Sequence, residues 1–239
     1  MELLLAWLVH LYTALGVVVA FLAVLSIEQG DFRSAFFLMA LAVALDATDG
    51  TLARAARVKE VIPWFDGEAL DGIVDYFNYV IVPALFFFRA SLLPPHDALW
   101  LAMLPLLASA YGFCQKSAKT ADHFFLGFPS YWNIVAFYLY VLKVPLWLNG
   151  FLIIAFSALV FVPMKYIYPS RSPRFRAQTN VLGVLWAINV LYVMYTLPEP
   201  PRTLVFASLV FPAYYVALSL WLEYRRLNEE AKNANPAPS

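Results

Sequence analysis

Asp46–Arg54 reads DATDGTLAR, and Gly67–Asp75, after a spacer of twelve residues, reads GEALDGIVD. Both stretches lie at the ends of strongly apolar segments, where an ionised side chain costs about 2.5–3.5 kcal/mol at mid-membrane. Residues three or four apart share one face of a helix, so each stretch presents a pair of aspartates on one side. The pairs are Asp46 with Asp49 and Asp71 with Asp75.

These aspartates are best explained as ligands for cations. If the two helices face each other, four carboxylates converge, and such a cluster repels itself unless cations lie within it. Hard oxygen ligands select Mg²⁺, Mn²⁺ or Ca²⁺ over zinc or copper. Two divalent ions about 3.5–4 Å apart would neutralise a pyrophosphate and stabilise a departing phosphate oxygen. The alternative is a set of helix-end aspartates solvated at the membrane surface.

Small and basic residues accompany the aspartates at fixed offsets. Gly50 and Ala53 are three apart and predict a groove beside the carboxylates, where a flat ligand or another backbone can approach. Arg54 adds a guanidinium suited to bidentate phosphate binding. With Gly67, these residues form a candidate nucleotide groove, and close helix packing is the alternative role of the glycines.

The combined pattern resembles the signature of the CDP-alcohol phosphatidyltransferase family. Eight residues carry the resemblance position by position: Asp46, Asp49, Gly50, Ala53, Arg54, Gly67, Asp71 and Asp75. The spacer between the two stretches is longer than in most of that family. This spacer and segment 119–133, which reads KTADHFFLGFPSYWN, are similar to the branch that makes phosphatidylcholine in bacteria.

The resemblance implies an enzyme that displaces CMP from CDP-diacylglycerol with an alcohol, and choline is the acceptor in that branch. It also implies Mn²⁺ or Mg²⁺ as cofactor, two divalent ions in all, and a homodimer. Asp71 and Asp75 are the expected catalytic residues, with Asp75 as general base toward the acceptor hydroxyl and also in contact with metal. The other metal ligands are expected at Asp46 and Asp49, and Asp49 is expected to face the nucleotide as well.

The acceptor site is predicted from the chemistry of choline. Its quaternary ammonium donates no hydrogen bond and is bound by aromatic faces together with a carboxylate. We expect the contact at Tyr131, Trp132 and Asn133, at the start of a helix, and an interfacial aromatic belt is the alternative role of the rings. The remaining candidates are Tyr76 as a ring, Glu68 and Asp122 as counter-charges, and Lys119 as a phosphate contact.

The chain as a whole is too apolar for a soluble domain. Of its 239 residues, 62% are hydrophobic and 13% are charged, which is typical of an integral membrane protein. We expect an all-α fold, a polytopic membrane bundle in one domain over residues 1–227, followed by a polar, disordered tail over 228–239. Apolar runs of about 17–25 residues predict spanning helices, and eight are expected, near 3–26, 33–57, 67–90, 96–117, 129–146, 148–166, 178–197 and 203–226.

The first expected helix carries three polar or small residues on one face. His10, Thr13 and Gly16 are spaced by three residues, so they lie on the same side of a helix. We expect this helix to pack beside the aspartates. A buried, hydrogen-bonded histidine is the expected role of His10, because imidazole is not needed where oxygen ligands dominate.

The placement of lysine and arginine predicts orientation. Twelve of these 16 residues fall on one side of the expected spans, and four, Arg33, Arg89, Lys143 and Arg202, fall on the other. Cytoplasmic loops are richer in lysine and arginine, so both termini and the aspartates are expected on the cytoplasmic side. The resemblance implies that the membrane is a bacterial inner membrane. The 16 basic residues are balanced by 16 acidic ones, which excludes a nucleic-acid partner because phosphate-backbone binding needs a basic surface.

Two other functions fit part of the pattern. One is the same displacement onto inositol, serine or glycerol phosphate. A phosphorylated acceptor would need cations in its pocket, and no lysine or arginine lies deep in the fourth to eighth expected helices. The other is a cation-coupled transporter, because intramembrane aspartates often mark ion paths. A transporter predicts flux without CMP release and leaves the Gly50, Ala53 and Arg54 offsets unexplained.

Overall fold

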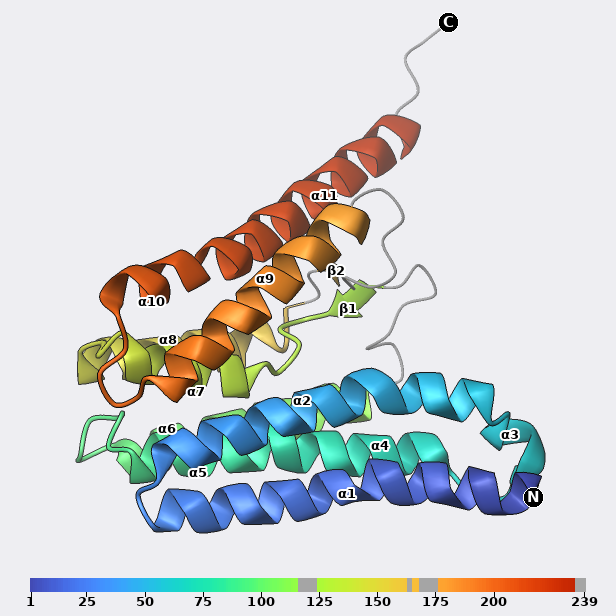
Figure 1. Cartoon of the computed structure of the whole chain (residues 1–239). Helices are drawn as coiled ribbons and strands as arrows, with labels where there is room; N and C mark the ends of the chain where they lie inside the picture. The colour runs from blue at the N-terminus through green and yellow to red at the C-terminus, as the bar shows by residue number, and fades with distance from the viewer. Residues whose placement is uncertain (116–123, 163–164, 168–175, 235–239) are drawn as a thin grey trace, which may run out of the picture. The chain divides into compact units, whose positions relative to one another are not determined.

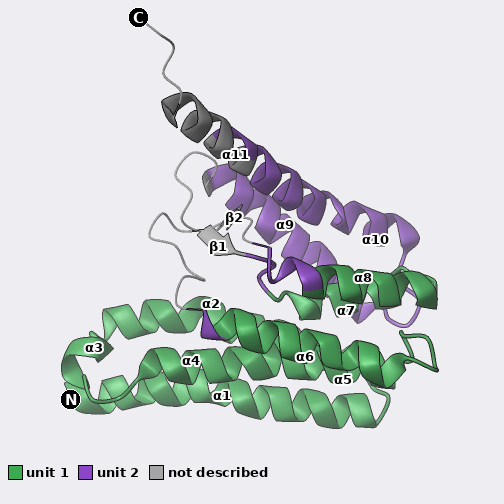
Figure 2. Cartoon of the chain, turned by 180° about the vertical axis from the view of Figure 1, so that it is seen from behind, with its two compact units in different colours: residues 1–113, 130–157 green, residues 114–129, 158–239 purple. Residues whose placement is uncertain are grey.

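The computed structural model describes residues 1–115, 124–162, 165–167 and 176–234. This part of the chain is helical apart from two short strands, β1 (Phe124–Leu126) and β2 (Lys165–Ile167), which pair antiparallel. The expected all-α membrane fold is therefore confirmed. The chain forms two compact units, residues 1–113 with 130–157 and residues 114–129 with 158–239 (Figure 2). Each unit is described by itself below.

Unit 1 contains the N-terminal helices and the two acidic stretches. Its elements in chain order are α1 (Glu2–Glu28), α2 (Phe32–Ala55), α3 (Val58–Val61), α4 (Gly67–Tyr76), the π-helical turn η1 (Phe77–Ile81), α5 (Val82–Arg89), α6 (Ala98–Cys114), α7 (Trp132–Val141) and α8 (Leu146–Leu159). Helices α1, α2 and the continuous α4–η1–α5 rod lie side by side (Figure 1). The two acidic stretches are thereby brought onto neighbouring helices.

Small side chains allow these helices to approach closely. Gly16 on α1 lies directly against α4, where an added Cβ would lie only 2.4 Å from Val74 Cγ1. Several alanines are buried in the same helices, where they bury surface without losing side-chain entropy. The buried ones include Ala20 and Ala23 on α1 and Ala35 and Ala42 on α2.

The turn between α1 and α2 is closed by polar contacts. Gly30 takes a left-handed φ of 74°, which glycine adopts without steric cost. Asp31 then caps α2 by accepting a hydrogen bond from Ser34 N at 3.1 Å, and hydrogen bonds from Ser34 lower the pKa of its carboxyl. On α5, Arg89 donates to both carboxylate oxygens of Glu28 at 2.7 and 2.6 Å. The ends of three helices are tied together here.

Unit 2 contains the two strands and three further helices. These are α9 (Arg176–Tyr195), α10 (Arg202–Ser208) and α11 (Val210–Ala234). Asn189 Nδ2 donates to Leu204 O at 3.0 Å, and the hydroxyls of Thr179 and Tyr214 are 3.0 Å apart. These contacts join α9 to α10 and to α11.

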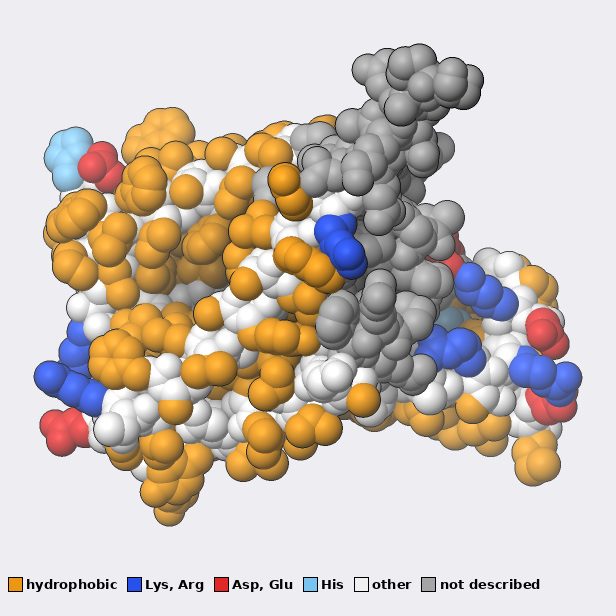
Figure 3. Space-filling model, turned by 90° about the horizontal axis from the view of Figure 1, so that it is seen from above, with side chains coloured by type: hydrophobic (Ala, Val, Ile, Leu, Met, Phe, Trp, Pro, Cys, Tyr) orange, Lys and Arg blue, Asp and Glu red, His pale blue; other side chains and the backbone are white. Residues whose placement is uncertain are grey.

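In the described part of the chain, five helices are long and apolar enough to cross a membrane. They are Glu2–Glu28, Phe32–Ala55, Gly67–Arg89, Ala177–Tyr195 and Arg202–Trp221. Three of the expected spans instead correspond to shorter apolar helices, Ala98–Cys114, Trp132–Val141 and Leu146–Leu159. The expected total of eight spans stays a prediction. Large hydrophobic side chains are exposed along these helices, and Figure 3 shows hydrophobic side chains over much of the surface that it draws. Such a surface suits contact with lipid.

Three expected helices differ in their bounds from the structure. The helix expected at 148–166 ends at Leu159, and Lys165–Ile167 forms β2. The helix expected at 129–146 has only ten residues, because Ser130 before it and Lys143 after it take left-handed backbone angles. The last helix extends to Ala234, past residue 228 where the polar tail was expected to begin. Residues 235–239 of that tail lie outside the described residues.

Candidate active site

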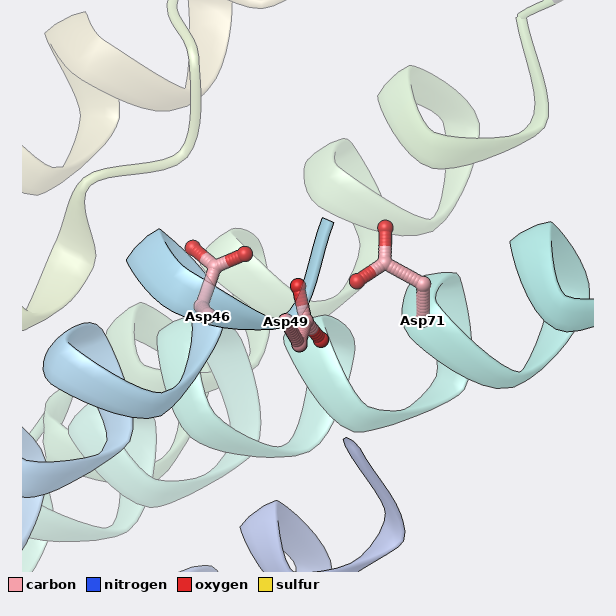
Figure 4. A group of neighbouring side chains, drawn as sticks. All are labelled: Asp46, Asp49 and Asp71. Carbon is pink, nitrogen blue, oxygen red and sulfur yellow. The ribbon is translucent and has the colours of Figure 1, made fainter. Parts of the chain in front are cut away.

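The structure brings three of the four motif aspartates around one point. One carboxylate oxygen each of Asp46, Asp49 and Asp71 lies within 4.8 Å of the other two. Asp46 and Asp49 project from α2 and Asp71 from α4, on the same side of both helices (Figure 4). Asp46 is exposed, Asp71 is half-buried and Asp49 is buried. The convergence expected from the spacing therefore holds for these three residues.

Asp75 belongs to the same cavity but not to the three-carboxylate group. A small cavity is lined by all four aspartates. Asp75 lies one turn beyond Asp71 on α4. It is half-buried there. Three carboxylates therefore converge on one point, and the fourth, that of Asp75, lines the same cavity outside this group.

Helix α1 supports the site from one side. Thr13 Oγ1 donates to Asp49 Oδ2 at 2.9 Å, and both residues are buried. Gly16, one turn along, contacts α4 and lines the same cavity. The expectation that this face of α1 packs beside the aspartates is confirmed. The spacing of His10, Thr13 and Gly16 suggested the face, but it did not reveal which aspartate Thr13 would contact.

His10 is buried at the N-terminal end of this face of α1. Its ring packs against Phe65 with 4.4 Å between centroids, and an added Cβ on Gly67 would lie 2.7 Å from His10 Cε1. Burial is as expected, and Nε2 has no hydrogen-bond partner among the described residues. The contact gives Gly67 a packing role, which was the alternative to a nucleotide groove.

The remaining groove residues differ in their surroundings. An added Cβ on Gly50 would meet only Arg54 Nη1, at 3.4 Å, so the space beside Gly50 is open. Arg54 Nη2 donates to Thr51 Oγ1 at 2.9 Å on the exposed side of α2. Ala53 packs against a buried cluster formed by α1 and α3. Gly50 and Arg54 are thus accessible to a ligand, whereas Ala53 and Gly67 also contact neighbouring elements. The nucleotide groove stays a prediction.

Tyr79 is a site residue that the motif did not single out. It lies in η1 and donates a hydrogen bond through its phenol to Asp46 Oδ2 at 2.7 Å. It also lines the aspartate cavity, together with its neighbour Asn78. Tyr79 is four residues beyond Asp75, so helical spacing was the available signal for it.

Most of the expected choline contacts lie away from this cavity. Trp132 is fully buried and donates from Nε1 to Ser109 Oγ at 2.8 Å. Asn133 is also buried, and its Oδ1 accepts from Ile134 N at 2.9 Å. Neither residue lines the aspartate cavity. Both side chains are buried and bonded within the helices, and their contact with choline stays a prediction.

The other expected choline residues give a mixed result. Tyr76 donates to Leu106 O at 2.7 Å and does not line the cavity. Glu68 forms an exposed ion pair with Lys59, and that hydrogen bond raises the pKa of Lys59. Tyr131 does not line the cavity either, and its contact with choline stays a prediction. The remaining two, Lys119 and Asp122, lie outside the described residues.

The carboxylate set fits a hard divalent cation. Three carboxylates supply only oxygen ligands, which Mg²⁺, Mn²⁺ and Ca²⁺ prefer. Oxygen atoms within 4.8 Å of one another can share one ion or a close pair. The fold and the site together define an integral-membrane helical protein with a carboxylate cluster on neighbouring helices that could hold such an ion.

Comparison with known proteins shows which family of integral-membrane proteins this chain resembles. No family model matches the chain. A phosphatidylcholine synthase of Legionella pneumophila is 38% identical over 96% of this chain and 93% of its own length. Those of Pseudomonas aeruginosa and Borreliella burgdorferi are 36% and 32% identical, over 92% and 95% of this chain and 92% and 98% of their own lengths. The chain belongs to the phosphatidylcholine synthase family.

Proposed function

We propose that this protein makes phosphatidylcholine by transferring the phosphatidyl group of CDP-diacylglycerol to choline, with release of CMP. Membership of the phosphatidylcholine synthase family supports the product. The observation that carries the chemistry is the group of three carboxylates on neighbouring apolar helices. A pyrophosphate and a lipid can meet at such a place only if the negative charges are neutralised.

Asp46, Asp49 and Asp71 would hold the divalent ions, Mn²⁺ or Mg²⁺. When bound, such ions supply positive charge that neutralises the pyrophosphate and stabilises the departing phosphate oxygen. The buried position of Asp49 and its bond from Thr13 keep one of these ligands in a fixed orientation. Arg54, exposed one turn beyond Gly50, is suited to bind a phosphate of the nucleotide.

Asp75 is proposed as the general base. Its carboxylate takes the proton from the choline hydroxyl, and the choline oxygen forms a bond to the phosphorus that bears diacylglycerol. The bond from that phosphorus to the bridging oxygen breaks, and CMP leaves with the electron pair. Asp75 is supported in this role because it lines the cavity without belonging to the three-carboxylate group.

The cellular setting is part of the proposal. The excess of basic residues on one side of the expected spans supports a cytoplasmic site in a bacterial inner membrane. CDP-diacylglycerol and membrane lipids would then reach the cavity from the bilayer and choline from the cytoplasm. A homodimer is proposed from the resemblance to the wider family.

One assay tests the proposed activity. Purified protein in detergent receives CDP-diacylglycerol, choline and Mn²⁺, and CMP and phosphatidylcholine are measured. We expect equal amounts of both products, dependence on choline, loss of both after EDTA and recovery with added Mn²⁺ or Mg²⁺. Lipid product from serine or inositol but not from choline would contradict the acceptor. Unchanged turnover in EDTA would contradict the metal centre.

A further inference from the structure

The helix that carries Asp71 and Asp75 is interrupted directly beyond them by a π-helical turn. Residues Phe77–Ile81 form η1, and the Val82 N–H bonds back five residues to Phe77 O. Single π-turns inside α-helices are rare and occur frequently at functional sites. Here the turn begins two residues after Asp75, so its side chains emerge beside the aspartate cavity.

Asn78 holds this turn in place. Its amide Nδ2 donates to Val74 O on the preceding turn and to Gly16 O on α1, both at 3.0 Å. The side chain is buried, with the residue 4% exposed. One amide therefore satisfies a carbonyl beside the π-turn and fastens the turn to the neighbouring helix.

The next residue reaches across to α2. The Tyr79 phenol donates to Asp46 Oδ2 at 2.7 Å. Asp46 is the exposed member of the three-carboxylate group, so burial does not restrict its side chain. Asp49, by contrast, is buried and held by Thr13 from α1. Each aspartate of α2 is thus bonded by a hydroxyl from a different helix.

We propose that Tyr79 is a positioning residue for the metal centre. Its phenol holds Asp46 in the orientation that shares one site with Asp49 and Asp71, and the π-turn fixed by Asn78 delivers the phenol there. Outer hydrogen-bond partners of metal ligands orient the ligand and raise metal affinity. This inference rests on the proposed metal dependence of the enzyme.

Direct metal binding tests the role of Tyr79. Mn²⁺ is titrated into the purified, metal-free full-length protein, and free Mn²⁺ is measured by electron paramagnetic resonance. We expect Tyr79→Phe, which removes only the phenolic oxygen, to bind Mn²⁺ about 10-fold more weakly than the unsubstituted protein. The matched control is Tyr12→Phe, which removes another phenol bonded to α2, at Thr48, and should change the affinity less than about twofold.

A variant cycle separates positioning from general packing. If Tyr79 acts only through Asp46, Tyr79→Phe should weaken Mn²⁺ binding no further in an Asp46→Asn background. Asn78→Ala, which releases the π-turn, should reproduce the loss seen with Tyr79→Phe. In the turnover assay, a higher Mn²⁺ concentration should restore the rate of the Tyr79→Phe variant. If the substitution had only disturbed helix packing, added Mn²⁺ would not restore the rate.

The outcomes distinguish this inference from the proposed function. Equal Mn²⁺ affinity of Tyr79→Phe and the unsubstituted protein would overturn the inference and leave the metal centre standing. Additive losses in the Asp46→Asn background would also overturn it. If the unsubstituted protein binds no Mn²⁺, the proposed metal dependence fails first, and the role of Tyr79 fails with it.

Discussion

At the scale of single residues, hydrogen bonds from hydroxyl groups orient the carboxylates of the α2 aspartates. Thr13 donates to Asp49 at 2.9 Å inside the bundle. A hydrogen bond to a charged group contributes about 1.5–3 kcal/mol. Replacing the donor with a methyl group of the same size leaves the buried carboxylate with one partner fewer. Asp49 then loses orientation as a ligand.

Thr13→Val tests this bond. We expect about 10-fold lower turnover at limiting Mn²⁺, because the change keeps the packing volume and removes only the donor. CMP release is the measurement. Thr48→Val is the matched control, since Thr48 is next to Asp49 in the chain and also contacts α1, but its hydroxyl bonds to Ala44 O, Leu45 O and the Tyr12 phenol rather than to an aspartate. Full activity of Thr13→Val under limiting metal would show that Asp49 needs no support from α1.

Asp75 permits a separate test of the chemical step. Asp75→Asn keeps the size of the side chain and removes its ability to take a proton, so turnover should be abolished while CMP binding is partly retained. Calorimetry with CMP and an assay of CMP release measure the two effects. Asp66→Asn serves as control, because Asp66 caps α4 through Ala69 N and asparagine caps equally well. Normal turnover by Asp75→Asn would refute the assignment of the base.

The aspartates could be predicted from the sequence, whereas most acceptor contacts could not. Charged residues in apolar helices have few explanations, and their spacing fixes a shared face. Aromatic residues such as Trp132 and Tyr76 are equally suited to a ligand or to packing. Only tertiary structure shows that Trp132 bonds to Ser109 and that Tyr76 bonds to Leu106.

At the scale of elements, the contact between α1 and α4 fixes the distance across the cavity. Gly16 lies against Val74, and an added Cβ would come within 2.4 Å of Val74 Cγ1. Atoms at that distance must move apart, and both residues lie on helices that carry site residues. Overpacking of this kind costs about 1–3 kcal/mol.

Gly16→Ala should therefore lower both thermal stability and turnover, and Val74→Ala in the same chain should restore much of each by making room. Melting in detergent and CMP release are measured for the two single variants and the double variant. Gly72→Ala is the control on α4, because nothing lies within 4 Å of its added Cβ. Gly72→Ala should be neutral or slightly stabilising, since alanine favours helix by about 0.5–1 kcal/mol over glycine. Independent, additive losses for Gly16→Ala and Val74→Ala would exclude the contact as the cause.

The elements were predictable to the extent that apolar length defines them. Helices α1, α2 and the α4–α5 rod match expected spans. Long apolar runs between polar turns form spanning helices in a membrane, because a helix satisfies all of its backbone hydrogen bonds internally. The π-turn at Phe77–Ile81 has no sequence pattern of its own. The Asn78 side chain within it bonds to Gly16 O of another helix, and such a tertiary contact cannot be read from the local sequence.

At the scale of the whole molecule, orientation in the membrane decides where the substrates enter. The distribution of lysine and arginine predicts that the end of α6 at Cys114 faces the cytoplasm and that the α1–α2 turn at Gln29 faces away from it. Cys114 is the sole cysteine of the chain and is exposed. The thiol of Cys114 in the unsubstituted protein can therefore report on which side of the membrane this end of α6 lies.

We expect a membrane-impermeant maleimide to label Cys114 in inside-out vesicles and not in intact spheroplasts. In a Cys114→Ser background, Gln29→Cys should show the reverse pattern, because Gln29 is exposed at the opposite end of α1 from the N-terminus. The measurement is the increase in protein mass after labelling. As a control, both thiols should be labelled in detergent-solubilised protein, where each is accessible to the maleimide. Labelling of Cys114 only from the outside would place the carboxylate cluster on the side without CDP-diacylglycerol, and the proposed reaction would then lack its donor.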